Sequence, residues 1–285
     1  MNKFEAVFTK LRSAGAGRSK YRERGTARHS ILLLFMWLTL VVSATDVKAN
    51  ASTENVQEIV EVCMLSNRML KDYALIGMGV VYQDPVADLQ AGMVEMSMYM
   101  STGSLDSYDL SEELGVSLRQ LEAAWSEIEP TLITEPSKDD VSDLRNKVEK
   151  FTTHCEQVVE ELAIDTQIPG QQELVLAGKL GMEVQRLAAL YMIQAWGAKH
   201  DQYHSEVKRI QSQFKKNYQQ LTSADSTGES EELRSLLKNV DNQFLVFGFL
   251  ASSKSGRYQP TRAEKIAANV FYEVRDILLL AEELL

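Results

Sequence analysis

One apolar stripe occurs twice in this chain, 119 residues apart, and this repeat most constrains the fold. The first copy runs from Leu114 to Leu132 and the second from Leu233 to Ala251, in steps of three and four. Residues at that spacing lie on one face of an α-helix, which must be buried against other helices. With 15 Gly and 5 Pro among 285 residues, the chain favours long helices over many short strands.

The same offset extends beyond the stripe, as a duplication predicts. Matching residues lie 118 to 120 positions apart, and the one-residue slips fall at predicted loops. The matches are Ser111 and Ser230, Trp125 and Phe244, Phe151 and Phe271, Met64 and Met182, Arg68 and Arg186, and Tyr73 and Tyr191. We therefore predict two tandem repeats, residues 50–168 and 169–285, joined at Ile168-Pro169-Gly170.

Each repeat is predicted to contain four helices. Their predicted ranges are 54–82, 86–102, 109–133 and 138–165 in the first repeat, and 171–199, 201–222, 229–252 and 261–284 in the second. The short connections force neighbouring helices to run antiparallel. The predicted fold class is all-α, with two tandem up-down-up-down four-helix bundles.

Residues 1–49 have the order of a secretory signal peptide with a long basic leader. Eight Lys and Arg residues precede a 14-residue apolar run, Ile31 to Ala44, and small residues follow at Ala44 and Ala49. The run is shorter than the roughly 20 residues of a membrane-spanning helix. We expect cleavage after Ala44 or Ala49 and a periplasmic protein; without cleavage the protein would be membrane-anchored.

Charge and motifs argue against several function classes. Residues 50–285 hold 21 basic and 37 acidic side chains, so the basic face that nucleic-acid binding requires is missing. Neither a nucleophile elbow nor a phosphate loop nor a dinucleotide fingerprint occurs, so we expect no enzyme activity. His200 and His204 are four residues apart, but a third ligand is not evident, and we expect no metal or cofactor.

The first helix of each repeat departs from the simple stripe. Residues 62–80 read VCMLSNRMLKDYALIGMGV, and residues 174–197 read LVLAGKLGMEVQRLAALYMIQAWG. Both segments resemble the first-helix signature of the PilJ family, roughly AGRQRMLSQRMAK. This family is the N-terminal domain of type IV pilus methyl-accepting chemotaxis transducers and is related to the periplasmic domain of nitrate/nitrite sensor kinases.

The match to that signature differs between the two copies. In the first, residues 64–69 match the RMLSQRM core, and Cys63 stands in place of the leading arginine. In the second, residues 177–180 match the opening, Met182 and Arg186 match the core, and Gly181 replaces the leading arginine. Both copies therefore keep the second arginine of the signature and lose the first.

The resemblance implies a sensor-type module whose paired first helices hold a small anion such as nitrate. The family's leading arginine is the residue expected to hold nitrate, and its absence weakens that expectation. Arg68 and Arg186 remain, and they would stand opposite each other if the two halves mimic a homodimer. Paired guanidinium groups can hold an anion through their planar donors. The candidate ligand-binding residues are Arg68, Arg186, Asn67, Lys179 and Gln185.

A purely structural role for the two arginines is the alternative. Each could pair with a nearby acid on its own helix, such as Glu61 or Glu183, because ion pairs of this kind are common on acidic helices. In that case the arginines would converge on no shared pocket.

Cys63 and Cys155 are the two cysteines of the chain. In the predicted antiparallel first and fourth helices they lie at about 13.5 and 15 Å from the same end, because each residue rises about 1.5 Å. Export to an oxidising compartment makes pairing plausible. We predict a disulfide, against the alternative of two buried free thiols.

The sequence as a whole predicts an exported, non-enzymatic, sensor-type protein that binds a small anion. It would signal through a separate membrane sensor or envelope protein, or act as a homodimer. The rival function is a structural scaffold or interaction module without a ligand. A water-accessible cavity lined by Arg68 or Arg186 would favour the sensor, and a dry core with an exposed apolar patch would favour the rival.

Overall fold

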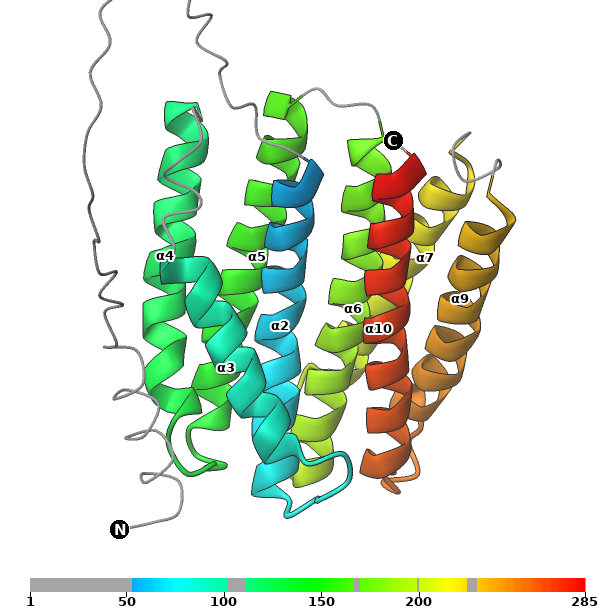
Figure 1. Ribbon diagram of the computed structural model, residues 1–285. Coiled ribbons are helices and arrows are strands. Elements are labelled where there is room, and N and C mark those ends of the chain that lie inside the picture. The colour runs from blue at the N-terminus through cyan, green and yellow to red at the C-terminus, as the bar shows by residue number, and fades with distance from the viewer. Residues whose placement is uncertain (1–52, 102–110, 167–169, 199, 225–229, 285) are drawn as a thin grey trace, which may run out of the picture. The chain divides into compact units, whose positions relative to one another are not determined.

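The computed structural model describes residues 53–101, 111–166, 170–198, 200–224 and 230–284, and within these ranges the chain is helical with no strand (Figure 1). The all-α prediction is therefore confirmed. The predicted signal peptide, residues 1–49, lies outside the described residues. Among the helices described, none is both long and apolar enough to cross a membrane.

Eight helices make up this part of the chain. They are α2 (Thr53–Gly77), α3 (Pro85–Ser101), α4 (Glu112–Leu132), α5 (Val141–Thr166), α6 (Gln171–Trp196), α7 (Tyr203–Thr222), α9 (Glu231–Ser252) and α10 (Pro260–Leu284). The largest error concerns the first helix, which was predicted to reach residue 82 but ends at Gly77. Gly79 has a φ of 69°, in the left-handed region, and this breaks the helix before the turn into α3.

The repeated Ser-Glu-Glu-Leu segment begins a helix in both halves. The Oγ atoms of Ser111 and Ser230 accept hydrogen bonds from the backbone N–H of Leu114 and Leu233, at 3.3 and 3.2 Å. Two glutamates follow each serine in the first helical turn, where their negative charge interacts favourably with the helix dipole. The repeated sequence therefore makes the same cap in both halves.

Helices α2 and α6, which carry the two motif copies, make the most extensive contact of any pair (Figure 1). Two glycines of α6 allow this approach. A Cβ atom on Gly178 would overlap the side chain of Val60, and one on Gly181 would overlap the sulfur of Met64. The two motif helices therefore pack closely through small residues of α6.

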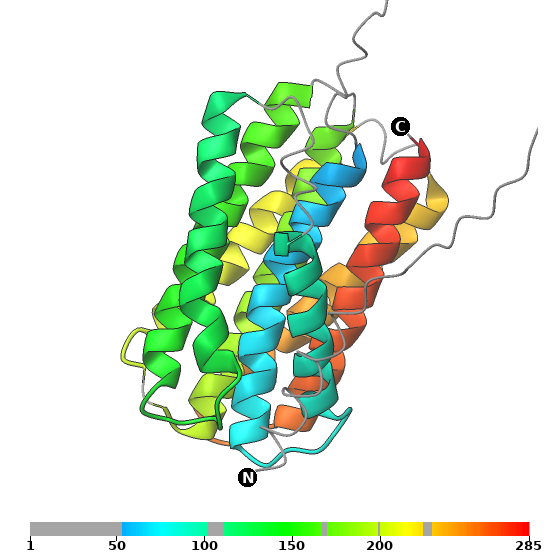
Figure 2. The ribbon, with the colours of Figure 1, turned by 60° about the vertical axis from the view of Figure 1, so that its left-hand side comes forward.

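Corresponding helices have corresponding neighbours in the two halves. Helix α2 packs on α3 and α5, and α6 packs on α7 and α10. Helix α4 packs on α5, and α9 packs on α10 (Figure 2). The second half also has a contact between α7 and α9, whereas the described parts of α3 and α4 make no comparable contact. The buried side chains of both halves join in one core.

The motif helices are tied to their own halves by a repeated hydrogen bond. The hydroxyl of Tyr73 accepts from the N–H of Ser137 at 3.0 Å, and that of Tyr191 accepts from the N–H of Gln259 at 2.7 Å. Each acceptor lies near the end of the first helix of its half, and each donor precedes the fourth. This shared contact fixes the entry of α5 and of α10.

Candidate functional site

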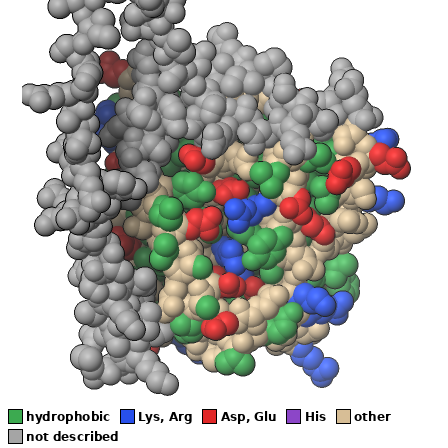
Figure 3. Space-filling model, viewed as in Figure 1, with side chains coloured by type: hydrophobic (Ala, Val, Ile, Leu, Met, Phe, Trp, Pro, Cys, Tyr) green, Lys and Arg blue, Asp and Glu red, His purple; other side chains and the backbone are tan. Residues whose placement is uncertain are grey.

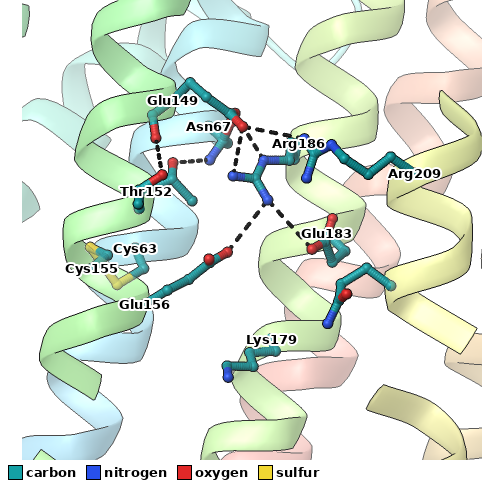
Figure 4. A network of polar contacts seen from close by, with 12 residues as sticks. Cys63, Asn67, Glu149, Thr152, Cys155, Glu156, Lys179, Glu183, Arg186 and Arg209 are labelled. Atoms are coloured by element: carbon teal, nitrogen blue, oxygen red, sulfur yellow. Dashed lines mark hydrogen bonds and ion pairs between the residues drawn. A yellow bond between two sulfur atoms is a disulfide. The ribbon is translucent and has the colours of Figure 1, made fainter. Parts of the chain in front are cut away.

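The disulfide lies beside the motif and joins α2 to α5. Cys63 and Cys155 are bonded, with their Cα atoms 5.6 Å apart and both side chains fully buried (Figure 4). The predicted disulfide is therefore confirmed. In the second half Gly181 takes the place of Cys63, and a Cβ atom there would lie 3.0 Å from Val274. The same motif position thus makes a covalent link in one half and a close packing contact in the other.

Arg186 is the centre of a charged cluster between the halves, which we call the α5–α6 cluster. Its Nε and Nη2 atoms donate to Glu149 of α5 at 2.9 and 3.0 Å, in a bidentate pair (Figure 4). Its Nη1 lies 3.4 Å from both Glu156 and Glu183. Arg209 of α7 completes the cluster, with its Nη2 3.2 Å from Glu149.

Each of the three guanidinium nitrogens of Arg186 contacts a protein carboxylate. Burial by itself lowers the pKa of Arg186, but the surrounding glutamates, Glu183 first, raise it above its ordinary value, so the group stays charged. The bidentate geometry that a nitrate-like anion would use is occupied by Glu149. The cavity beside Arg186, which Asn67, Arg145 and Glu206 also line, has a volume of about 10 Å³, room for about one water molecule.

Arg68 belongs to a second cluster, which we call the α2–α10 cluster. Its Nη2 lies 3.2 Å from Asp88 of α3, and its Cζ lies 4.6 Å from the ring centre of Phe271 in α10, a cation–π distance. Glu61, the acid expected to pair with Arg68, instead binds Arg275 of α10 at 3.2 Å. That expected pairing is wrong, because the helix opposite Glu61 supplies a different cation.

Lys71 and two carboxylates form the buried part of the α2–α10 cluster. Lys71 Nζ lies 2.6 Å from Glu264 Oε1 of α10 and 3.0 Å from Asp72 Oδ1. Oxygens of Asp72, Glu264 and Asp88 lie within 4.8 Å of one another, and the two cations Lys71 and Arg68 lie beside them. Each of the three acids forms an ion pair with one of these two cations. This group was missed from sequence, because Lys71 and Asp72 look like ordinary solvent-exposed residues of an amphipathic helix.

The two motif arginines do not share a pocket. Arg68 contacts Asp88 of α3 and Phe271 of α10, whereas the ion-pair partners of Arg186 lie on α5 and on α6 itself. The expected convergence is therefore wrong. Because α2 and α6 pack closely, each arginine lies beside the contact between these two helices. There Arg68 reaches α10 and Arg186 reaches α5, a helix of the other half in each case.

The other candidate residues are divided among separate contacts. Asn67 donates to Thr152 Oγ1 at 2.8 Å, and Gln185 donates to the carbonyl oxygen of Ala267 at 2.9 Å. Each amide thus joins the first and fourth helices of one half. Lys179 pairs with Glu160 of α5 and lies apart from Arg68. Of the five candidates, Asn67 and Arg186 line one small cavity together.

Each cluster contains an acid with a strongly raised pKa. Burial raises the pKa of Glu183 to about 7, although Arg186 opposes this shift. Burial likewise raises the pKa of Asp72 to about 7, although Lys71 opposes it. Within the described residues, Oδ2 of Asp72 and Oε2 of Glu183 and of Glu264 are buried and accept no hydrogen bond. Both clusters therefore hold carboxylates that burial disfavours in the charged form.

Charges of both signs are interspersed on the face formed by α3, α2 and α10 (Figure 3).

His200 and His204 do not come together at a site. His200 Nε2 lies 3.0 Å from Glu206, and His204 packs its ring against the edge of Tyr203. In the ranges that the structure describes, no histidine belongs to a group of side chains able to hold a metal.

Comparison with known proteins identifies no relative: no family model matches the chain, and no match was found among curated proteins or solved structures. The resemblance to the PilJ family therefore rests on the motif residues of α2 and α6. It stays a prediction, and the contacts of those residues are the basis for the function proposed below.

Proposed function

We propose that this protein is an exported, non-enzymatic helical module of the cell envelope that acts by contacting another protein. The observation that carries the proposal is the state of Arg186. Its bidentate donors are taken by Glu149, and its side chain is 7% exposed. A module built to capture an anion would leave such donors facing a cavity.

The charge around Arg186 argues in the same direction. Two cations, Arg186 and Arg209, face the three carboxylates of Glu149, Glu156 and Glu183. The cluster thus has an excess of negative charge when all groups are ionised, and it repels an incoming anion. Arg68 is likewise neutralised by Asp88. This favours the interaction module over the anion sensor.

An apolar patch on α9 is the proposed contact surface. Leu245, Val246 and Phe249 are 62%, 43% and 79% exposed. At the offset of 119, the corresponding positions of α4 are Ser126, Glu127 and Pro130. Helix α4 packs on α5 without such a patch, in the way that α9 packs on α10. The exposed apolar residues of α9 are therefore not needed for packing within the fold. Exposed apolar side chains that gather on one face favour contact with a protein partner.

We further propose that the module consists of two PilJ-like four-helix repeats, residues 50–168 and 169–285, exported by the segment 1–49. The repeated serine caps, the paired tyrosine hydrogen bonds and the matching helix neighbours support the duplication. The disulfide between Cys63 and Cys155 supports an oxidising compartment such as the periplasm.

An anion screen tests the absence of a ligand site. Residues 49–285, the unit that contains every described helix, would be melted with nitrate, nitrite or chloride at matched ionic strength. We expect equal melting temperatures, because a ligand raises stability only if it binds the folded state. A nitrate-specific rise that Arg186→Ala abolishes would restore the anion sensor and contradict the proposal.

Site-specific photo-crosslinking in cells tests the contact surface. A photoreactive residue at position 249 is expected to trap a protein partner. The same residue at position 130, the matching position of the other half, is the control and is expected to trap little. Equal trapping at the two positions would show that the α9 patch has no special role.

A further inference from the structure

Both charged clusters contain one more carboxylate than cations. In the α2–α10 cluster, the groups are Arg68 and Lys71 against Asp72, Asp88 and Glu264. In the α5–α6 cluster, they are Arg186 and Arg209 against Glu149, Glu156 and Glu183. The neighbouring pairs Lys179–Glu160 and Arg145–Glu206 are neutral, so they leave the excess of one negative charge unchanged.

The excess charge is buried. Asp72 and Glu183 are 1% and 3% exposed, and each has a carboxylate oxygen without a hydrogen-bond donor among the described residues. A buried carboxylate without full compensation is costly. Binding of one proton removes the charge and turns one oxygen into a hydrogen-bond donor.

Both clusters lie where one half of the protein meets the other. In the first, Asp72 on α2 and Asp88 on α3 come close to Glu264 on α10. In the second, Glu183 on α6 faces Glu149 and Glu156 on α5 across Arg186. The excess negative charge therefore destabilises the contacts between the halves.

We propose that the two clusters are a pair of proton-binding sites that tighten the contact between the halves as the pH falls below neutrality. Each cluster takes up one proton from solvent onto a carboxylate, and nothing is released. The groups facing Asp72 are Arg68 and Lys71 from α2, Asp88 from α3 and Glu264 from α10. Those facing Glu183 are Arg186 from α6, Glu149 and Glu156 from α5 and Arg209 from α7.

The direction of the pH effect follows from the raised pKa values. Burial places the pKa of Asp72 and of Glu183 at about 7, above their ordinary values of 3.8 and 4.5. At a pH between the ordinary and the raised pKa, the folded protein binds more protons than the unfolded chain. The free energy of unfolding therefore rises as the pH falls from about 7 toward the ordinary pKa values. A conventional ion-paired carboxylate has a lowered pKa and gives the opposite dependence.

Chemical unfolding of residues 49–285 between pH 8 and pH 5 tests this device. The unfolding equilibrium constant of the parent is expected to fall as the pH falls from 7 to 5, by up to about tenfold per pH unit for each cluster. Asp72→Asn with Glu183→Gln removes both excess charges and should flatten this dependence. The control is Glu122→Gln, an exposed acid of α4, which should keep the slope of the parent.

Carbon-13 NMR of the side-chain carboxyl groups gives a readout that does not depend on the folding of the variants. Two carboxyl carbons of the folded parent are expected to titrate near neutral pH. The proposal is overturned if all carboxyl groups titrate below pH 6. It is equally overturned if the double variant keeps the pH dependence of the parent, or if the parent loses stability between pH 7 and pH 5.5.

Discussion

Replacement of Arg186 by alanine removes the cation around which three carboxylates are arranged. Glu149 would keep one partner, Arg209, at 3.2 Å, whereas Glu183 and Glu156 would lose the guanidinium group that lies 3.4 Å from each. The side chain of Glu183 is 4% exposed, so water cannot replace the lost contact. The variant is therefore expected to destabilise the fold, which an arginine reserved for a ligand would not do.

The magnitude follows from the burial of this pair. Removal of one partner from a buried ion pair costs about 3 to 5 kcal/mol. We expect the lower end, about 3 kcal/mol at pH 8, because Glu183 can take up a proton and so limit the penalty. In a domain of this size that corresponds to a fall in Tm of about 6–12 °C. At pH 5.5 the loss should be smaller, since protonation already neutralises the excess charge.

Urea unfolding followed by circular dichroism measures this loss. Arg209→Ala is the matched control: Arg209 also contacts Glu149, but its side chain is 50% exposed, so its loss should cost no more than about 1 kcal/mol. If Arg186→Ala and Arg209→Ala were equally stable at pH 8, Arg186 would not stabilise the contact between the halves, and the reasoning would be refuted.

Two further variants, one of them with a matched control, test the packing around the motif helices. Cys63→Ala with Cys155→Ala opens a disulfide that spans 92 residues; loop-closure entropy predicts a loss of about 4.6 kcal/mol, and an unchanged urea midpoint would contradict this. Gly178→Ala places a Cβ atom against Val60 and should cost about 1–3 kcal/mol. A Cβ atom at Gly115 would lie 3.5 Å from the side chain of Arg119, an ordinary contact, so Gly115→Ala should instead raise stability by up to about 1 kcal/mol; equal effects of the two glycine changes would exclude a tight contact.

The helices were predictable because their apolar stripes are local signals. The stripe from Leu114 to Leu132 and its copy in α9 have every third or fourth residue buried, as the spacing requires. The disulfide was predictable because helical rise and antiparallel connection place Cys63 and Cys155 at similar heights. Each of these predictions depends only on the sequence of one helix, or on two helices that are neighbours within one half.

The charged clusters were not predictable because they depend on which helices of different halves meet. Glu61 pairs with Arg275, 214 residues away, and no local pattern indicates that contact. Helix α6 is buried on nearly all sides, so polar residues such as Glu183 and Arg186 lie in the interior without an apolar stripe to mark their direction. Sequence therefore identified the motif arginines and the contact of Arg186 with Glu183 of its own helix, but not the partners on other helices, Glu149 and Glu156 for Arg186 and Asp88 for Arg68.

A double-mutant cycle between Arg186 and Glu149 is the most direct test of the role of the motif arginine. It distinguishes an arginine that stabilises the contact between the halves from one that binds an anion. Unfolding free energies of the parent, Arg186→Ala, Glu149→Ala and the double variant would be measured in chloride and again in nitrate at equal ionic strength. We predict a coupling energy of about 2 kcal/mol, the same in both salts. A coupling near zero in chloride, together with stabilisation of the parent by nitrate, would contradict this account.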